Sequence, residues 1–399
     1  MTVSSVPLGD LIRPAKVERA ADRVFPILSM TMRGGLVDQA SKFKKRIASI
    51  DTSGYKVVLR NQLVVGFPID EGVLSFQDLY DKAIVSPAYD VWELRAEREV
   101  EPRYLERFLR SPLALRYYMR KLRGTTARRR TLPDDVFLEL EVPLPPAPEQ
   151  RRLADALEKA DSIRRRRKEA IVLADELLRS TFLEIFGDPI SNPKGWKIVP
   201  LLKFGRITTG NTPPRAVPAN FGDDIEWIKS DNINTSSHFL TRATEGLSKA
   251  GRAQGRTAPV GSTLMTCIAG SSDCIGNVAI ADREVAFNQQ INAITPNEGV
   301  DYRYLYVLLL VGKRLVQSAS TNSMKGMVSK GRLEQVQVPS PPPSKQAQFG
   351  EAFDRILALS RRQEAAWTDS DRLFNAVLGN AFGEPARPRA GAGQDQWSA

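Results

Sequence analysis

A duplicated segment constrains this chain more than any other feature of its sequence. Val142-Pro143-Leu144-Pro145-Pro146 recurs as Val338-Pro339-Ser340-Pro341-Pro342, an offset of 196 residues. From Val142 to Pro189, 14 of 48 positions are identical to their partners at that offset. Chance would match only a few positions, so the chain contains two copies of one structural plan.

The repeat continues upstream with one change of register. Residues 100–105, Val-Glu-Pro-Arg-Tyr-Leu, match residues 300–305, Val-Asp-Tyr-Arg-Tyr-Leu, at an offset of 200. Each copy therefore has a globular part, a proline-rich hinge and a long segment that ends in Phe-Gly-(Asp/Glu)-Pro. The 399 residues provide enough chain for two or three domains.

Both long segments are predicted to be helices, because apolar residues recur in them at threes and fours. Glycine and then proline end each of them, at Gly187 and Pro189 and again at Gly383 and Pro385. The residues expected to pair the helices are Leu153, Leu157, Ile163, Ile171, Leu177, Leu178, Phe353, Ile356, Leu359, Trp367, Leu373 and Phe374.

Connectivity predicts the direction of these helices. The first leads from one globular part to the other, so the second must run back along it, antiparallel. A helix of about 39 residues is roughly 58 Å long and would hold the globular parts apart. The resulting approximate two-fold symmetry matches the local symmetry of duplex DNA.

The predicted fold class is α+β, with two globular mixed α/β domains separated by two long antiparallel coiled-coil-like helices. Short strands are expected at 57–59, 63–65, 225–228 and 263–268, and helical segments at 104–121 and 302–316. The expected segments are globular domains at 1–145 and 191–340, spacer helices at 146–190 and 341–385, and a disordered tail at 386–399.

Few side chains are available for metal or nucleophile chemistry. The chain has one histidine, His238, and two cysteines, Cys267 and Cys274, which excludes a zinc finger or zinc deaminase. His238 follows a polar stretch and is expected in a surface loop rather than in a catalytic triad. Two cysteines provide no disulfide framework, which favours a reducing compartment. No export or membrane segment is recognisable, so we expect a cytoplasmic protein.

Motifs of catalysis are also missing from the sequence. It has no phosphate-binding loop, no dinucleotide fingerprint and no Asn/Asp-Pro-Pro-aromatic motif of amino-methyltransferases. The pairs Asp134-Asp135 and Asp223-Asp224 are expected in solvated loops rather than as nuclease metal ligands. We therefore predict no catalytic residue, no metal site and no cofactor in this chain, and favour a binding module.

Charge indicates what such a module would bind. There are 57 Lys and Arg against 46 Asp and Glu, a net charge of +11, which favours a polyanion. Basic and polar segments recur at comparable places in both copies, where they can contact phosphates and base edges. The candidate DNA-binding residues are Arg33, Lys42, Lys44, Lys45, Arg46, Arg123, Thr125, Thr126, Arg128, Arg129 and Arg130 in the first copy, and Asn211, Lys229, Asp231, Asn232, Asn234, Ser271, Ser272, Asn288, Gln289, Gln290, Asn322 and Lys325 in the second.

For any one of these residues a solvated loop is the simpler interpretation, and only their recurrence favours binding. The basic run Arg164 to Lys168 in the first helix has three interpretations that stay open. It could contact phosphates between two half-sites, pair with an acidic partner, or be a solvated helix face.

Taken together, these residues resemble the specificity subunit of type I restriction-modification systems, over nearly the whole chain. The most specific likenesses are the hinge with Glu149-Gln150, the helix end Phe186-Gly187-Asp188-Pro189, Gly195-Trp196-Lys197, Glu226-Trp227-Ile228-Lys229, and Asn288-Gln289-Gln290-Ile291. The second hinge departs from the pattern, with Lys345 where Glu149 stands in the first.

The resemblance implies a non-catalytic subunit with two target recognition domains, each reading half of a bipartite double-stranded DNA target. The two helices would set the gap and dock two methyltransferase subunits, which bring S-adenosylmethionine. A restriction subunit that uses ATP and Mg²⁺ could join. Two other hypotheses remain: a scaffold that pairs protein partners, and the severed recognition part of a fused restriction-methylation enzyme.

Overall fold

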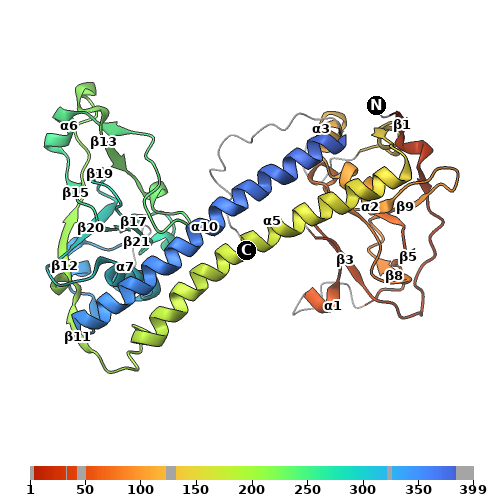
Figure 1. The fold of residues 1–399 in the computed structure, drawn as a ribbon. Helices are drawn as coiled ribbons and strands as arrows, with labels where there is room; N and C mark the ends of the chain where they lie inside the picture. The colour runs from red at the N-terminus through yellow and green to blue at the C-terminus, as the bar shows by residue number, and fades with distance from the viewer. Residues whose placement is uncertain (1–3, 33, 43–50, 123–131, 321–325, 383–399) are drawn as a thin grey trace. The chain divides into compact units, whose positions relative to one another are not determined.

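The computed structural model describes residues 4–32, 34–42, 51–122, 132–320 and 326–382, and the chain divides into two compact units (Figure 1). Unit 1 comprises residues 1–167 and 366–399, and unit 2 comprises residues 168–365. Each unit combines one globular module with part of α5 (Ala147–Phe186) and part of α10 (Pro343–Phe382). The segment boundaries given above stay predictions, and the tail 386–399 lies outside the described residues.

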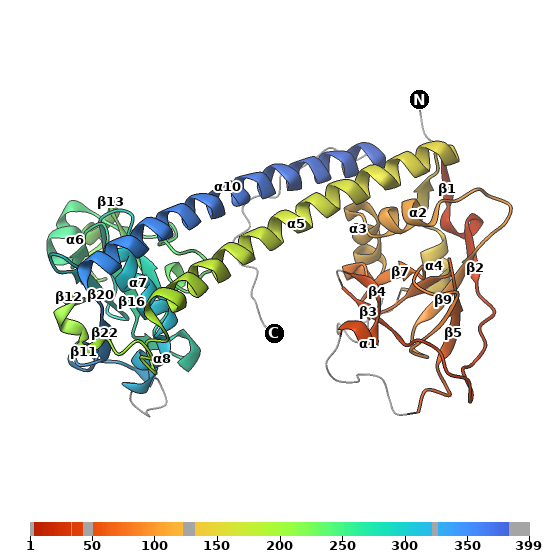
Figure 2. The same cartoon turned by 60° about the horizontal axis from the view of Figure 1, so that its bottom comes forward.

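The main sheet of unit 1 is antiparallel, with strand order β2-β9-β6-β7. Apolar side chains of these strands and of two helices meet in one core, which includes Leu63, Trp92 and Tyr104. The elements are β2 (Ile12–Pro14), β6 (Leu63–Val65), β7 (Leu74–Phe76), β9 (Asp90–Leu94), α2 (Pro102–Leu109) and α3 (Pro112–Lys121). Figure 2 shows α2 and α3 between α5 and these strands.

A second group of strands in unit 1 forms two antiparallel pairs, β3-β4 and β5-β8. A parallel bridge between Ile27 and Ile84 joins the pairs, so their order is β4-β3-β8-β5. The strands are β3 (Leu28–Thr31), β4 (Gly35–Asp38), β5 (Lys56–Leu59) and β8 (Lys82–Val85). The strands predicted at 57–59 and 63–65 are confirmed, but they lie in different sheets.

Unit 2 repeats this topology. Its main sheet has the order β12-β20-β16-β18, again antiparallel, and its second sheet has the order β14-β13-β19-β15 with β13 parallel to β19. The strands are β12 (Gly205–Thr209), β13 (Phe221–Ile228), β14 (Gly246–Leu247), β15 (Thr257–Ala258), β16 (Thr263–Thr266), β18 (Val278–Ile280), β19 (Val285–Phe287) and β20 (Ile291–Pro296). The predicted strands at 225–228 and 263–268 are confirmed.

Most of the remaining elements of unit 2 have a counterpart in unit 1, but the strand pair β17-β21 has none among the described residues. In unit 1 they are β1 (Ser5–Pro7), α1 (Gln39–Lys42), α4 (Asp134–Leu138) and β10 (Glu141–Pro143). In unit 2 they are β11 (Lys197–Pro200), α6 (Lys249–Gln254), β17 (Ile268–Ala269), α7 (Tyr302–Val311), α8 (Lys313–Ser318), β21 (Gly326–Met327), α9 (Lys330–Glu334) and β22 (Gln337–Ser340). β1 pairs with β10 as β11 pairs with β22.

Both predicted helical segments of the modules are interrupted. Residues 104–121 belong to α2 and α3, and Ser111 caps α3 by accepting a hydrogen bond from the Ala114 N–H at 3.3 Å. Residues 302–316 belong to α7 and α8, which meet at Gly312. A serine cap or a glycine at these points ends one helix and starts the next.

The two hinges use the same hydrogen bonds. Gln150 accepts the Glu101 N–H at 2.9 Å and donates to the Pro145 carbonyl at 2.9 Å. Gln346, 196 residues later, accepts the Asp301 N–H at 3.2 Å and donates to a proline carbonyl at 2.9 Å. Both glutamine side chains are buried, so these bonds satisfy groups that water does not reach.

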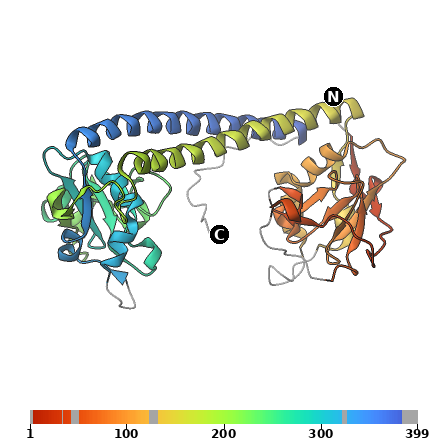
Figure 3. The ribbon, with the colours of Figure 1, turned by 90° about the horizontal axis from the view of Figure 1, so that it is seen from below.

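The long helices pack antiparallel in each unit. In unit 1 the start of α5, at Leu157, shares a core with the end of α10, at Phe382. In unit 2 the end of α5, at Phe182, shares a core with the start of α10, at Phe349. Figure 3 shows the strands of unit 2 on one side of these helices. α5 ends before Gly187, whose φ of +78° is the left-handed conformation that glycine adopts easily.

Among the described residues, no helix is long and apolar enough to cross a membrane. The same residues contain no group of three or more His, Cys, Asp or Glu side chains placed to hold a metal ion. The prediction that the two aspartate pairs lie in loops is wrong. Asp134 and Asp135 open α4, and Asp223 and Asp224 lie within β13.

Candidate nucleic-acid interface

The ends of several strands meet at one edge of the module in unit 2. The Gly210 N–H, just after β12, donates to the Ile291 carbonyl at the start of β20, and the Asn288 N–H donates to the Ile228 carbonyl at the end of β13. The Cys267 N–H, just after β16, donates to the Gln290 carbonyl. We call the residues that follow these strand ends the polar edge of unit 2: 210–212, 229–234, 267–274 and 288–290.

Every candidate in unit 2 that the structure describes belongs to this polar edge. The sequence placed them far apart, and the topology brings them together because β12, β16 and β19 end there while β20 begins there. Connecting loops at the end of a rigid sheet are where binding residues are usually found.

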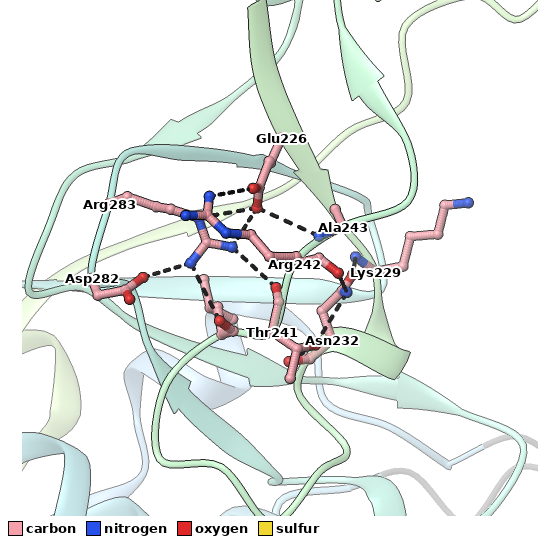
Figure 4. A network of polar contacts seen from close by, with 9 residues as sticks. Glu226, Lys229, Asn232, Thr241, Arg242, Ala243, Asp282 and Arg283 are labelled. Carbon is pink, nitrogen blue, oxygen red and sulfur yellow. Dashed lines mark hydrogen bonds and ion pairs between the residues drawn. The ribbon is translucent and has the colours of Figure 1, made fainter. Parts of the chain in front are cut away.

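A network of charged side chains holds the segment 229–245 in place (Figure 4). Arg283, between β18 and β19, forms a hydrogen bond through Nε to the Glu226 carboxylate of β13 at 3.0 Å. Its guanidinium also donates to the carbonyls of Leu240 at 3.2 Å and Thr241 at 3.0 Å. Arg242 donates to the other oxygen of Glu226 at 2.7 Å.

Burial tends to raise the pKa of Glu226, but hydrogen bonds from Arg283 and Arg242 outweigh it and hold that pKa below its usual value. The carboxylate is therefore charged at neutral pH and fastens two points of one loop. Charge-assisted hydrogen bonds of this kind are stronger than neutral ones. The network makes the polar edge a fixed surface rather than a loose loop.

Three of the candidate DNA-binding side chains are asparagines that form hydrogen bonds inside the module. The Asn232 amide accepts the Lys229 N–H at 3.0 Å and donates to the Arg242 carbonyl at 3.0 Å, and the side chain is buried. Asn211 likewise accepts the Arg256 N–H at 2.8 Å and donates to a carbonyl at 2.9 Å.

Asn288 is the third of these, and its buried amide bonds both ways to Gln290 at 3.1 Å. Both ends of all three amides form hydrogen bonds within the protein, so Asn211, Asn232 and Asn288 shape the edge, and their contact with DNA stays a prediction. Gln290 is the partner of Asn288 and shares this role.

Five other candidates present exposed side chains at the polar edge. They are Asp231, Asn234, Ser271, Ser272 and Gln289. Asn234 accepts hydrogen bonds through its carbonyl oxygen, from Asn277 at 2.8 Å. Gln289 accepts the Thr212 hydroxyl at 2.5 Å. These contacts orient each amide while its side chain stays exposed.

Lys229 lies in an aromatic and acidic setting. Its ammonium group is 5.3 Å from the ring centroid of Trp227 and pairs with Glu245. Arg215 also pairs with Glu245, at 3.1 Å, and stacks over Trp227 at 5.2 Å. The hydrogen bond from Lys229 holds the pKa of Glu245 below its usual value. Two cations are thus kept at the polar edge with one carboxylate between them.

Most candidates of the first copy lie outside the described residues, as do two of the second. These are Arg33, Lys44, Lys45, Arg46, Arg123, Thr125, Thr126, Arg128, Arg129, Arg130, Asn322 and Lys325. Lys42 ends α1. The corresponding strand ends of unit 1 expose Met32 after β3 and Phe67 after β6, which are 57% and 55% exposed.

The predicted pairing stripe is partly buried. Leu157, Leu178 and Phe353 are buried, and Leu153, Ile356 and Phe374 pack against the two cores. Four further members of the predicted stripe have exposed side chains: Ile163, Leu177, Leu359 and Leu373. Ile171 and Trp367 are half-buried.

The basic run of α5 begins with a structural residue. Arg164 pairs with Asp161 at 2.7 Å and with Asp371 of α10 at 3.2 Å, and its guanidinium lies 4.2 Å from the ring centroid of Phe374. Arg165 pairs with Asp161 at 3.2 Å. Arg164 therefore fastens α5 to α10 in unit 1, an interpretation that the sequence did not suggest.

The prediction of a surface position for His238 is wrong. Its side chain is 16% exposed, its Nδ1 lies 2.9 Å from the Tyr306 hydroxyl, and its ring packs edge-on against Phe353. Sequence reasoning also missed Arg283 and Glu245. Both lie in connections between strands, and nothing in the neighbouring sequence distinguishes either from a solvated charged residue.

Comparison with known proteins gives a family for this arrangement. Residues 193–366 match the model of the type I restriction modification DNA specificity domain. The HindI specificity subunit of Haemophilus influenzae is 30% identical over 141 residues, covering 35% of this chain and 28% of the relative. The MjaIX specificity subunit of Methanocaldococcus jannaschii is 27% identical over 179 residues, covering 43% and 40%. The matches thus span less than half of either relative.

Solved structures agree over nearly the whole chain. A structure described as the basis of complex assembly and conformational transition of the type I R-M system has a TM-score of 0.57 at 19% identity, covering 95% of this chain and 97% of that one. The type I S subunit of M. genitalium has a TM-score of 0.56 at 13% identity, covering 95% and 96%. Identities this low show the shared fold alone, which is the predicted α+β arrangement of paired modules and long helices. By its match to the specificity domain at residues 193–366 and by its curated relatives, the chain is similar to type I restriction-modification specificity subunits, and it shares its fold with the solved structures.

Proposed function

We propose that this chain is the non-catalytic DNA-specificity subunit of a type I restriction-modification complex and reads a bipartite target. Each module reads one half-site, and the two long helices set the unread gap between them. The observation that carries the proposal is the repeated topology: two copies of one scaffold are joined to the same pair of helices.

The polar edge of unit 2 supplies suitable chemistry for reading base edges. The exposed amide of Gln289 can donate and accept at once, which is how adenine is distinguished in the major groove, and the exposed amide of Asn234 can donate through its NH₂ group. Lys229 and Arg215 stand beside them and can approach phosphates, which fix register without reading sequence. The Glu226–Arg283 network fastens the segment that carries Asn234, and the Thr212 hydroxyl orients the amide of Gln289.

The edge of unit 1 predicts a different half-site. Exposed Met32 and Phe67 suit apolar contact, for example with a thymine methyl group. In this proposal the two modules read two different sequences, so the whole target is asymmetric even though the scaffold is nearly two-fold.

The gap follows from helix length. α5 is one helix of 40 residues, about 60 Å long at 1.5 Å per residue. The same helices also offer a surface for partners. In unit 2 Val172, Leu173 and Leu177 are 48%, 55% and 46% exposed on neighbouring turns of α5. An exposed apolar stripe of this kind fits the docking of methyltransferase subunits.

Catalysis is assigned to those partners. Methyltransferase subunits would bring S-adenosylmethionine and methylate adenine, and a restriction subunit would use ATP and Mg²⁺. In this proposal the chain itself contributes sequence reading, gap length and docking.

The test is to co-express the chain with its methyltransferase subunit and map methyladenine by long-read sequencing. We expect one motif with two half-sites and a fixed unread gap. A single continuous motif, or no methylation above that of the methyltransferase subunit alone, would contradict the proposal. Binding by the complex should also weaken steeply as salt rises, because phosphate contacts release counterions; a pure protein scaffold would show no DNA binding to weaken.

A further inference from the structure

One loop side chain of unit 2 contacts three helices. The imidazole Nδ1 of His238 lies 2.9 Å from the hydroxyl of Tyr306 in α7, and its Nε2 lies 3.5 Å from the carboxylate of Asp175 in α5. The ring also packs edge-on against Phe353 in α10, with centroids 6.3 Å apart. A side chain held on three sides has one available orientation, so it fixes the loop that carries it.

The backbone around His238 extends the main sheet. The Ile280 N–H of β18 donates to the His238 carbonyl at 2.9 Å, and the Leu240 N–H donates to the Ile280 carbonyl at 3.1 Å. Phe239 forms a parallel bridge with Ile280, and its ring lies 5.1 Å from the guanidinium of Arg361 in α10. Residues 238–240 therefore lie on the edge strand of the sheet and against the helices at once.

The same loop reaches the polar edge. Asn234 accepts a hydrogen bond from the Asn277 amide at 2.8 Å and lies 3.4 Å from the Thr266 hydroxyl at the end of β16. Asn234 and His238 are four positions apart in the chain, which is at most about 14 Å when fully extended. The segment 234–240 is thus a short, direct connection between the polar edge and the long helices of unit 2.

Unit 1 satisfies the same sheet edge in another way. Phe76 pairs with Leu63 in β6–β7 as Ile280 pairs with Thr263 in β16–β18. The Phe76 N–H donates to the carboxylate of Glu106 at 2.8 Å. Glu106 stands 200 residues before Tyr306, so a helix side chain does in unit 1 what the His238 segment does in unit 2.

We propose that His238 is a positioning residue that fixes the polar edge of unit 2 to the long helices and thereby keeps the gap between half-sites constant. The inference rests on the proposed function, because it needs a bipartite target. His238 touches no base in this scheme; it acts through the segment 234–240. The charged and titratable groups that face it are Asp175 and Arg179 of α5 and Tyr306 of α7, with Arg361 of α10 on the neighbouring Phe239.

The experiment uses the full chain co-expressed with its methyltransferase subunit and mapped for methyladenine. The variants are His238→Ala, His238→Asn, which keeps a polar group near Nδ1, and Tyr306→Phe, which removes one oxygen. Ser236→Ala, at an exposed position of the same loop, is the matched control.

We expect the wild type and Ser236→Ala to mark both half-sites with a single gap. His238→Ala should mark the same half-site bases but discriminate about tenfold less against gaps that differ by one base pair, a loss of about 1.4 kcal/mol. Tyr306→Phe should show a smaller loss, and His238→Asn should recover part of the discrimination. A merely structural role would lower the amount of complex without changing the spread of gaps.

Two results would overturn the inference. One is a spread of gap lengths in His238→Ala that is as narrow as in Ser236→Ala. If His238→Ala yields no complex, a spread in Tyr306→Phe that is as narrow as in Ser236→Ala would overturn the inference instead. The other is a change in the half-site bases at constant gap, which a base-contacting residue would produce. Absence of a bipartite motif in the wild type would instead contradict the proposed function, so the two failures are distinguishable.

Discussion

The hinges of the two units share their main hydrogen bonds, whereas the described strand ends at the polar edge of unit 2 and in unit 1 expose different side chains. Gln150 and Gln346 make equivalent hydrogen bonds, and Tyr104 and Tyr304 each donate to a proline carbonyl, at 2.7 and 2.9 Å. Exposed loops tolerate substitution because a change there leaves no buried polar group without a hydrogen-bond partner. A set of buried hydrogen bonds does not tolerate substitution, because the loss of one partner leaves the other unsatisfied. The comparison teaches that the buried scaffold is what the two copies share, and that they differ in the exposed side chains at their described strand ends.

The largest expected difference between the units is the loss of unfolding free energy caused by a substitution where the long helices enter their cores. Phe182 is fully buried and contacts the rings of Phe186, Tyr304 and Phe349, whereas Leu378 at the equivalent position of α10 only packs against the core of unit 1. Phe182→Ala should lower the free energy of unfolding by about 3–5 kcal/mol, and Leu378→Ala should lower it by about 2–3 kcal/mol. Denaturant unfolding followed by hydrogen exchange in each unit measures both. Equal losses of stability in the two variants would contradict this expected difference between the units.

The hinges, by contrast, should respond alike. Gln150→Leu and Gln346→Leu each leave a buried backbone N–H and a proline carbonyl unpaired, so each should cost about 2 kcal/mol in its own unit. Gln348→Leu, at an exposed position near the second hinge, is the control and should cost little. If only one of the two hinge variants is destabilised, the hinges are not energetically equivalent.

A substitution at the polar edge of unit 2 should change base discrimination in only one of the two half-sites. Gln289→Ala removes an exposed amide of the polar edge, and we expect about tenfold weaker discrimination, about 1.4 kcal/mol, at one base pair of the unit 2 half-site. The unit 1 half-site should not change. Glu298→Gln, beyond the opposite end of β20, is the control. A loss shared by both half-sites would show that Gln289 affects the complex as a whole.

The smallest effect concerns pH, and it should separate the units because the histidine lies in unit 2. Burial lowers the pKa of His238 below 6.5, Arg179 acts in the same direction, and Asp175 opposes both. The unfolded chain then binds the proton more readily than the folded one. Stability of unit 2 is therefore complete above pH 6.5 and falls as the pH drops below it, by at most about 1.4 kcal/mol per pH unit.

Urea unfolding of unit 2 between pH 7.5 and 5.5 measures this slope, with His238→Gln as the comparison. The variant should lose the histidine contribution to the slope. An identical pH dependence in both proteins would show that His238 does not titrate in this range.

The scaffold could be predicted from the sequence because the repeat carries it. The end of α5 before Gly187 and the strands at 63–65 and 225–228 follow from local patterns of apolar residues, glycine and proline. The interruptions at Ser111 and Gly312 were missed, because helical periodicity continues across them.

The binding edge was predictable only in part. Its segments were found as polar stretches, but which amides face outward depends on their neighbours. Asn232 and Asn288 serve their own turns, a common use of asparagine that a sequence cannot distinguish from binding. His238 was misplaced for a different reason: Asp175 and Phe353, which contact it, lie 63 residues before it and 115 after it.

The most direct test of the central claim changes the helices and leaves the edges alone. Four residues of good helix propensity are inserted into α5 between Arg167 and Lys168, and four into α10 between Ala365 and Ala366, which adds about 6 Å or close to two base pairs. Methyladenine mapping of the complex should then show the same two half-sites with a gap about two base pairs longer. An unchanged gap, or altered half-site bases, would contradict the account that the helices set the gap and the edges read the sequence.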